Sequence, residues 1–378
     1  MNIIDSELVG SHQKLSASPK VVFVRAVNFF LVPLMLLSAI LAETIFEELQ
    51  IVSELFLMFI FTILLAKGKF NKQELALLLV FIVSQIGSFF VNNISTWMLD
   101  GKLLGLAVLA IIYFRRHATD SFFVHTAFIL CVLLIVIQRA LGYFPLPISQ
   151  FMTTLAGELS GRPLGLFLNY HYTTFFLATY ILGYTLKRKV FPFDYIIIAS
   201  TGVMTSLVSY IGQKSFNLIK PVLKLHSLKS QLLVFIGGIF LITLLFQFSI
   251  FILEKFNIQS ASGLVVLYQI IDFNTYTRML SVFPADIYTF YENNVYDYSD
   301  LNIEGFGEHG NEMFLVTLFV QAGALLAIAF LLFLIWSVPN SRIFILLSLL
   351  HYSHLLSPFI IYVICMFENM NKKVLGST

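Results

Sequence analysis

The sequence is poor in charged residues. Only 12% of its 378 residues are Asp, Glu, Lys or Arg, whereas 58% are hydrophobic, and the mean hydropathy is +0.87. Soluble domains carry about 25% charged residues, so this chain has roughly half the charge needed to cover a surface that faces water. The composition excludes an ordinary soluble enzyme and indicates a membrane protein.

Cysteine is also scarce, and several motifs are missing. Cys131 and Cys365 lie inside apolar stretches, which predicts buried packing residues rather than a disulfide framework or a thiolate metal site. The chain has no Gly-x-x-x-x-Gly-Lys-Ser/Thr loop, no His-Glu-x-x-His, no Asp-rich metal motif and no Gly-x-Ser-x-Gly elbow. These absences argue against ATP-driven transport by this chain alone and leave metal-dependent chemistry without obvious ligands. The net charge of +2 gives no reason to expect nucleic acid as a partner.

Apolar stretches recur along the whole chain. A spanning helix needs about 20 mostly apolar residues, and the last stretch contains Ser357-Pro358, which would split it into two short helices. The pattern predicts an all-α fold in which residues 1–378 form a single polytopic membrane domain with about 10–12 transmembrane helices. The predicted spans are roughly 23–42, 50–66, 75–92, 98–114, 121–141, 164–186, 193–211, 231–253, 313–336 and 343–366.

Lysine and arginine in the short loops predict the orientation. Basic residues occur at 67–72, 115–116 and 187–189 and alternate with acidic loops such as 43–48, which places the N-terminus in the cytoplasm. The alternation breaks after residue 193, because the loop 212–230 carries four lysines. We expect the chain to reach the outer face near 209–214 and to return through a short helix over 215–226, broken at Pro221. An interfacial loop that ignores the rule is the alternative.

Residues 254–312 form the single long loop, which is expected on the external side. The loop contains nine carboxylates, two basic residues and eleven Phe or Tyr residues. Aromatic faces stack on sugar C–H groups and carboxylates accept from hydroxyls, so this mixture is typical of a carbohydrate-binding surface. A small cap folded on the membrane, with its aromatic residues at the interface, fits the loop equally well.

Three groups of cationic side chains are expected to converge at the outer face. Arg162, followed by His171, precedes one span, Lys214 ends another, and Arg278 lies in the long loop. Cations at an interface are costly unless they are hydrated or paired, so this convergence suggests an anionic ligand, and a diphosphate suits arginine. Taken singly, Arg162 and Lys214 are equally well explained as interface anchors, Arg278 as the partner of an acid in its own loop, and His171 as the partner of a neighbouring helix.

Histidines supply the remaining candidates. His309, immediately before a span, is the preferred general base for a hydroxyl, and Glu308 is the rival. His351 and His354 lie three residues apart in the last apolar stretch. We interpret them as a pair satisfied inside the helix bundle rather than a metal or haem site, because no third ligand can be named.

Several of these residues occur in motifs that resemble those of the O-antigen polymerase and ligase superfamily of bacterial envelopes. Arg162-Pro-Leu-Gly-Leu-Phe-Leu-Asn169-Tyr-His171 looks like its Arg-x-x-Gly-Leu-Phe motif followed by a polar Asn/His step. Ile211-Gly-Gln-Lys-Ser215 resembles its Gly-Ser-Arg motif, with Lys214 in place of Arg. His309-Gly-Asn311-Glu-Met-Phe, followed by Phe319-Val-Gln-Ala-Gly323, is similar to its His-Asn step and apolar run, with Gly310 inserted. The resemblance covers roughly residues 155–335.

The resemblance implies a membrane-embedded glycosyltransferase with a GT-C-like fold in the bacterial inner membrane. It would be metal-independent, inverting and without a cofactor, and it would elongate a surface polysaccharide such as O-antigen or capsule. Its donor would be an oligosaccharide repeat on undecaprenyl diphosphate, and its partners would include membrane lipids, a flippase and a chain-length regulator. Arg162, Lys214 and Arg278 would stabilise the leaving diphosphate, with His171, Asn169 and Asn311 beside the substrate and His309 or Glu308 as base.

Two alternatives stay open. A ligase would transfer the same glycan to lipid A core. A flippase or another transporter would move it without making bonds, but a transporter is expected to place charges near the midplane of several spans. In most predicted spans, charged residues are absent or lie near an end.

Overall fold

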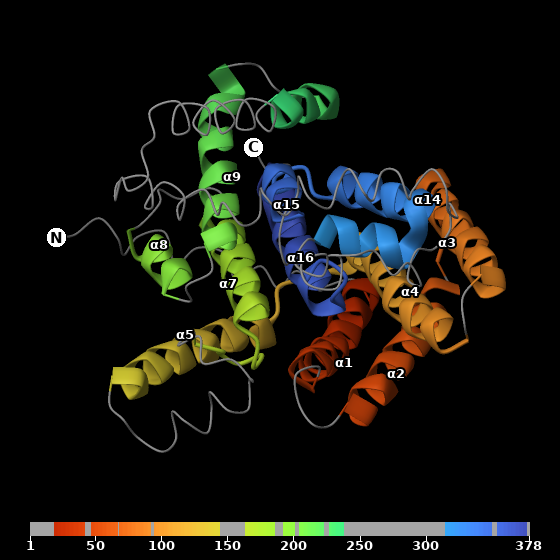
Figure 1. Ribbon diagram of the computed structural model, residues 1–378, viewed down its shortest axis with the longest axis horizontal. Coiled ribbons are helices and arrows are strands. Elements are labelled where there is room, and N and C mark those ends of the chain that lie inside the picture. The colour runs from red at the N-terminus through yellow and green to blue at the C-terminus, as the bar shows by residue number, and fades with distance from the viewer. Residues whose placement is uncertain are drawn as a thin grey trace, which may run out of the picture.

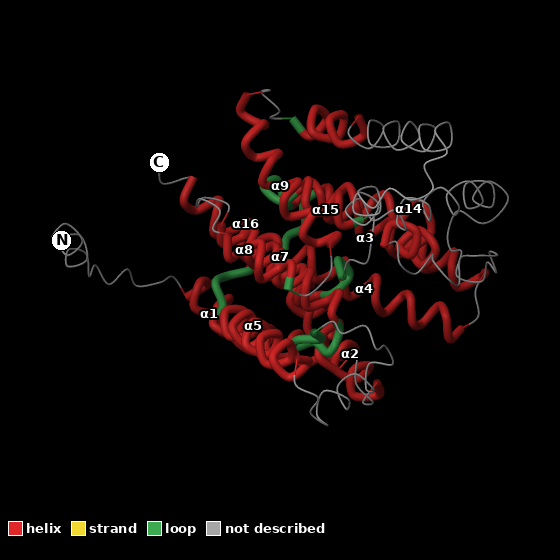
Figure 2. Tube along the Cα trace, turned by 60° about the vertical axis from the view of Figure 1, so that its left-hand side comes forward, coloured by secondary structure: helices red, strands yellow, loops and turns green. Residues whose placement is uncertain are grey.

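The computed structural model describes ten segments of the chain, and all the elements in them are helices (Figure 1). Figure 2 likewise contains no strand in the part of the chain that is described. The segments are 19–41, 47–66, 68–91, 94–143, 163–185, 192–200, 204–222, 227–237, 314–349 and 354–375.

The first five predicted spans are helices, with bounds within a few residues of those predicted. Runs of apolar residues form helices in a membrane because a helix satisfies all its own backbone hydrogen bonds. Among the helices that the structure describes, four are long and apolar enough to cross a membrane, and they are α1, α2, α3 and α5. The bounds are α1 Pro19–Leu41, α2 Glu47–Ala66, α3 Lys72–Val91, α4 Ile94–His117 and α5 Phe122–Tyr143.

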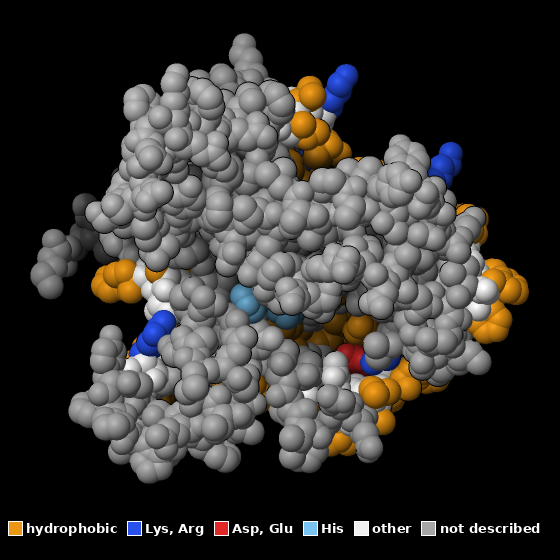
Figure 3. All heavy atoms as spheres, in the orientation of Figure 1, with side chains coloured by type: hydrophobic (Ala, Val, Ile, Leu, Met, Phe, Trp, Pro, Cys, Tyr) orange, Lys and Arg blue, Asp and Glu red, His pale blue; other side chains and the backbone are white. Residues whose placement is uncertain are grey.

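Large apolar side chains cover the outward faces of these helices. Phe30 on α1 is 74% exposed and Phe90 on α3 is 80% exposed, and Figure 3 shows such hydrophobic side chains at the edges of the described surface. Apolar surface of this extent is unfavourable in water and suits contact with lipid tails. The exposed residues and the four apolar helices therefore agree on an α-helical membrane protein.

Helix α4 lies at the centre of the packing. It contacts α2, α3 and α16 (Pro358–Leu375). Phe114 of α4 is fully buried and packs edge to face against Phe61 of α2 and Tyr362 of α16, with ring centroids 5.2 and 4.8 Å apart. This aromatic cluster ties the N-terminal helices to the C-terminal one.

The middle of the chain departs from the predicted spans. The predicted span 164–186 becomes helical only at α7 (Tyr170–Thr185), and the predicted span 193–211 is divided between α8 (Pro192–Ala199) and α9 (Met204–Val222). Tyr210 contacts Asp194 and Tyr195, so α8 and α9 run antiparallel. The predicted reversal near 209–214 is wrong, because α9 is continuous there and the chain reverses between the two helices instead.

The C-terminal part contains two further breaks. Gly323 interrupts α14 (Phe314–Ser337) with φ 68° and ψ 162°, a conformation reserved for glycine. Figure 1 shows α14 as a bent helix. The last predicted span is divided between α15 (Arg342–Ser348) and α16, which begins at Pro358. Of the predicted span 231–253, the structure describes a helix over 228–237, and the remainder lies outside the described residues.

The helices define two ends of the bundle. At the Arg115 end, the Asn369 side chain of α16 donates to the carbonyls of Phe114 and Ala118. At the Asn169 end, the Gly165 N–H donates to Gln138 of α5. Because α5 starts beside Ala118 and rises about 24 Å between residues 122 and 138, the two ends are separated by nearly the thickness of a hydrocarbon core.

Candidate functional site

Three of the predicted site residues lie in the described part of the chain, namely Asn169, His171 and Lys214. The other five, together with the loop 254–312, lie outside the described residues, and their roles stay predictions. They are Arg162, Arg278, Glu308, His309 and Asn311.

The segment 163–169, directly after Arg162, is a fixed non-helical turn. The Gly165 N–H donates to Gln138 Oε1 at 3.0 Å, and the Thr173 hydroxyl donates to the Leu164 carbonyl at 2.5 Å. Gly165 has φ 67°, and a Cβ there would lie 2.5 Å from Thr173 Cγ2. Leu168 also has a positive φ, of 55°. Gly165 adopts its positive φ readily, whereas Leu168 is a non-glycine residue with a positive φ, the kind of strained backbone that functional sites often contain. Contacts with α5 and α7 hold this segment.

Asn169 and His171 begin helix α7. The Asn169 side chain accepts the Tyr172 N–H at 3.0 Å, and its carbonyl accepts the Thr173 N–H at 2.9 Å. Asn169 is therefore the N-cap of the helix, a structural role for a residue that the resemblance places beside the substrate. His171 lies in the first turn and is half-buried.

A cluster of polar side chains that the sequence analysis did not identify lies next to this N-cap. Tyr172 Oη is 2.5 Å from Ser357 Oγ, and the rings of Tyr172 and His354 are 4.5 Å apart. His354 Nε2 is buried without a hydrogen-bond partner among the described residues. We call Tyr172, His354 and Ser357 the Tyr172 cluster.

His354 does not lie in a helix, so the structure gives no support to its predicted pairing with His351 on one helix face. His354 follows α15 and precedes α16 in a turn closed by the Ser357 N–H and the His354 carbonyl, and His351 lies outside the described residues. Ser357-Pro358 was the sequence signal for this turn, since proline is tolerated in the first turn of a helix and disfavours helical backbone at the residue before it.

Lys214 lies elsewhere in the bundle. Its ammonium group is 5.7 Å from the centre of the Tyr210 ring and is attracted by Asp194. The neighbouring Gln213 accepts the Phe344 N–H in the first turn of α15. The start of α15 lies near the Arg115 end, because Ser341 donates to Glu368 of α16. About 15 Å of α16 separates Ser357, beside Tyr172, from Glu368, which binds the start of α15. The structure does not bring Lys214 to Asn169 and His171.

Arg139 is a cation at the Asn169 end that the sequence analysis did not select. Its Nε and Nη2 atoms both donate to the Ser200 carbonyl, at 2.9 and 2.6 Å. It adjoins Gln138, which holds Gly165. The available signal was an arginine near the end of an otherwise apolar span, where a charged side chain is unfavourable unless it is paired or functional.

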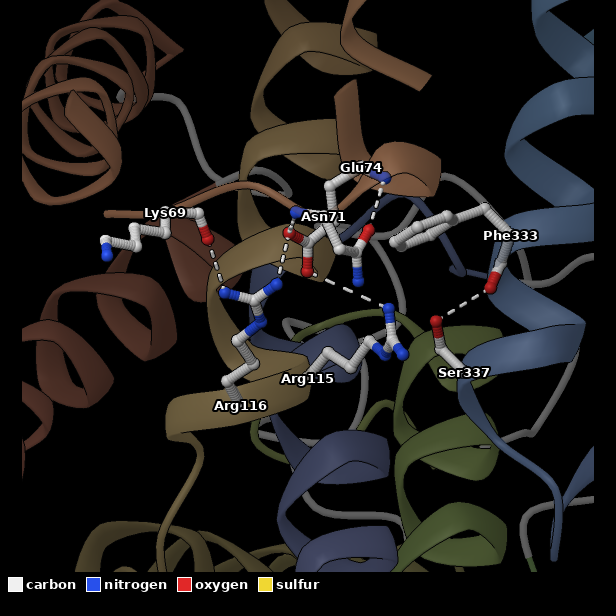
Figure 4. A network of polar contacts seen from close by, with 7 residues as sticks. All are labelled: Lys69, Asn71, Glu74, Arg115, Arg116, Phe333 and Ser337. Carbon is white, nitrogen blue, oxygen red and sulfur yellow. Dashed lines mark hydrogen bonds and ion pairs between the residues drawn. The ribbon is translucent and has the colours of Figure 1, made fainter. Parts of the chain in front are cut away.

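The Arg115 end contains a charged network that joins α3, α4 and α14 (Figure 4). Asn71 and Glu74 form a reciprocal capping box, with bonds of 2.9 and 2.8 Å. Glu74 is fully buried, 2.5 Å from Arg116 and 3.8 Å from Arg115. The Arg115 guanidinium lies 3.6 Å from the centre of the Trp336 ring. Burial lowers the pKa of Arg115, and Glu74 acts in the opposite direction.

A second charged pair lies deep in the bundle. Lys102 Nζ of α4 is 2.5 Å from Glu54 Oε2 of α2, and the two side chains are only 10% and 7% exposed. Gln50 donates to the other Glu54 oxygen at 2.8 Å. Lys102 lies 13 residues before Arg115, about 20 Å of helix, so the pair is far from the Arg115 end. Glu54 and Lys102 lie inside the predicted spans 50–66 and 98–114, so both spans bury a charged side chain.

These arrangements define the class of the protein as an all-helical membrane protein with polar sites at both ends. Histidine side chains reach the surface near the middle of the face shown in Figure 3. Within the part of the chain that is described, no three His, Cys, Asp or Glu residues are placed to hold a metal ion. Comparison of the chain with family models, curated proteins and solved structures finds no significant match.

Proposed function

We propose that the protein is a surface-polysaccharide polymerase of the bacterial inner membrane, with about 10–12 spanning helices, a GT-C-like fold and a cytoplasmic N-terminus. It transfers a glycan chain from undecaprenyl diphosphate to a new lipid-linked repeat unit. The reaction is inverting and needs neither a metal nor a nucleotide. The external loop 254–312 supplies part of the glycan site.

The turn at 163–169 carries this proposal. An arginine that only anchors a helix at the interface needs no special backbone after it. Here the residues that follow Arg162 contain two positive-φ positions, and α5 and α7 hold them through Gln138 and Thr173. A turn that is held in this way fixes the backbone next to the predicted diphosphate ligand Arg162, as pre-organised binding of a leaving group requires.

The chemistry assigns a role to six of the eight predicted residues. The acceptor hydroxyl attacks C1 of the donor sugar, its proton passes to His309, and the bond from C1 to the diphosphate oxygen breaks with its electron pair on the leaving undecaprenyl diphosphate. Arg162 and Arg278 stabilise the charge that develops there, and Arg139 provides a further cation at the Asn169 end. Glu308 is the alternative base, and Asn311 and His171 contact the glycan.

The test uses purified protein in liposomes with undecaprenyl-diphosphate-linked repeats from its source, in EDTA and without nucleotides. A ladder of lengthened glycolipids is expected. His309→Ala should abolish the ladder while the protein remains in the membrane, because the acceptor hydroxyl loses its base. An active His309→Ala variant would refute that assignment, and Glu308→Gln then tests the rival.

Two other activities are outcomes of the same assay. Product that forms only after lipid A core is added would identify the ligase. No product with either acceptor would favour a transporter, and the buried Glu54–Lys102 pair is the observation that supports this alternative, because ionisable groups within spans often mark transport paths.

A further inference from the structure

We propose that the Tyr172 cluster is a sugar-binding subsite that holds the uncharged ring next to the diphosphate through its hydroxyl groups. This inference rests on the proposed function. It assigns a specificity role to Tyr172, which directly follows the motif at 162–171, and to His354 and Ser357, which lie outside the stretch 155–335.

The cluster has hydrogen-bonding capacity that the described residues do not use. Tyr172 Oη and Ser357 Oγ share one hydrogen bond, so the hydroxyl that accepts still has its own proton to donate. His354 Nε2 is buried and has no partner among the described residues. Buried polar groups are nearly always hydrogen-bonded, and an exception calls for an explanation. A ligand that both donates and accepts, such as a sugar hydroxyl, meets both requirements.

The position of the cluster suits a ring close to the membrane surface. Helix α7 begins at Tyr170 and α16 at Pro358, each within two residues of a cluster member. Their 16 and 18 residues rise about 24 and 27 Å towards the Arg115 end. Helices of that length nearly cross the hydrocarbon core, so their common starting point lies near the opposite interface, where a sugar linked to a lipid diphosphate is found.

The chemistry of the cluster fits a neutral sugar better than the diphosphate. Its side chains are two hydroxyls and an imidazole, and no lysine or arginine of the described residues hydrogen-bonds to them. A diphosphate requires cations to offset its charge, and the predicted ones are Arg162 and Arg278. The cluster is therefore the site for the ring that the diphosphate carries.

The cluster is held rigidly from two distant parts of the sequence. Asn169 caps the helix at Tyr172, and the Thr173 hydroxyl bonds the Leu164 carbonyl. Across the site, Ser357 N–H bonds the His354 carbonyl and the Ser357 carbonyl accepts the Ile361 N–H. Such support lets a binding site discriminate by geometry, because little order has to be created when the ligand arrives.

The experiment measures binding of two probes to the full-length protein in nanodiscs, undecaprenyl diphosphate carrying one sugar and undecaprenyl diphosphate alone. Tyr172→Phe and Ser357→Ala should each weaken binding of the sugar-bearing probe about fivefold to tenfold, the effect of one lost hydrogen bond. Binding of the bare diphosphate should stay unchanged. Tyr180→Phe is the matched control on the same helix, because its hydroxyl bonds His125 near the Arg115 end.

Thermal unfolding of each variant shows whether it is folded, and His354→Phe repeats the test with a ring retained. If a folded variant binds both probes equally weakly, or binds both as tightly as the wild type, the subsite is overturned. Polymer synthesis by the wild-type protein would still support the proposed function in that case. Wild-type protein that binds the sugar-bearing probe no better than the bare diphosphate would also overturn the subsite. Failure of the wild-type protein to make polymer is recorded separately, in the ladder assay.

Discussion

At the residue scale, single side chains hold together elements that are far apart in sequence. Glu74 is the clearest case, because one buried carboxylate caps α3 and faces two arginines of α4. The sequence analysis placed Arg115 and Arg116 in a short loop after a span, whereas both lie in the last turn of α4. It gave no sign that their counter-charge would come from the start of the preceding span, since pairing across 42 residues has no local pattern.

Replacing Glu74 should lower the free energy of unfolding of the protein. Glu74→Gln leaves the two guanidinium groups without their carboxylate, and removing one member of a buried ion pair typically costs about 3–5 kcal/mol. Because Arg116 is partly exposed, we expect the lower end of that range. Chemical unfolding in detergent measures the effect. Lys69→Gln is the control, since Lys69 joins the network only through its backbone carbonyl and its side chain is exposed. Equal loss in the two variants would contradict the role of Glu74.

Gly165 should be as intolerant of a side chain as its backbone suggests. Gly165→Ala places a Cβ 2.5 Å from Thr173 Cγ2 at φ 67°, and a left-handed non-glycine residue costs about 1–2 kcal/mol before any clash. The turn after Arg162 should shift, so the ladder assay should show a rate of polymer synthesis at least tenfold slower. The melting temperature should fall only modestly. Full activity in this variant would mean that the turn does not position the reaction.

At the element scale, hydropathy predicted where helices exist but not where they break, and the break before Pro358 was predicted from its proline instead. The first five stretches are helices because long apolar runs have one stable backbone form in lipid. The later stretches are interrupted at 163–169, after Ala199, at Gly323 and before Pro358. A window that averages over about 20 residues cannot register a single left-handed glycine. The Tyr172 cluster arises from two of these breaks, which is why its residues, 185 positions apart, could not be assembled from the sequence.

The bend in α14 should depend on Gly323. Gly323→Ala forces a Cβ into a conformation that only glycine adopts readily, which costs about 1–3 kcal/mol. The melting temperature in detergent should fall accordingly. Gly237→Ala is the opposite case, because a Cβ there meets nothing within 4 Å and the residue is helical. That variant should be neutral or stabilised by up to about 1 kcal/mol. A stabilised Gly323→Ala would show that the bend is not required.

At the scale of the whole molecule, the described contacts give the bundle a consistent direction. Helices α7 and α16 run side by side from the Asn169 end to the Arg115 end, as Tyr172 beside Ser357 and Tyr180 beside Phe367 show. Because the chain reverses between α8 and α9, α9 runs back towards the Arg115 end and carries Lys214 with it. The positive-inside pattern anticipated a hidden reversal in this part of the chain, but only the tyrosine contacts between α8 and α9 locate it.

The Glu54–Lys102 pair tests whether the bundle is a scaffold for transfer or a path for transport. Glu54→Met and Lys102→Met each strand one buried charge and should lower the free energy of unfolding by about 3–5 kcal/mol. The double variant removes both charges, and its stability should return to the wild-type value or exceed it, because an apolar pair of similar volume needs no desolvation. A scaffold predicts an unchanged glycan ladder in the double variant. A stable double variant that has lost all glycan movement in liposomes would instead show that the pair itself carries the function.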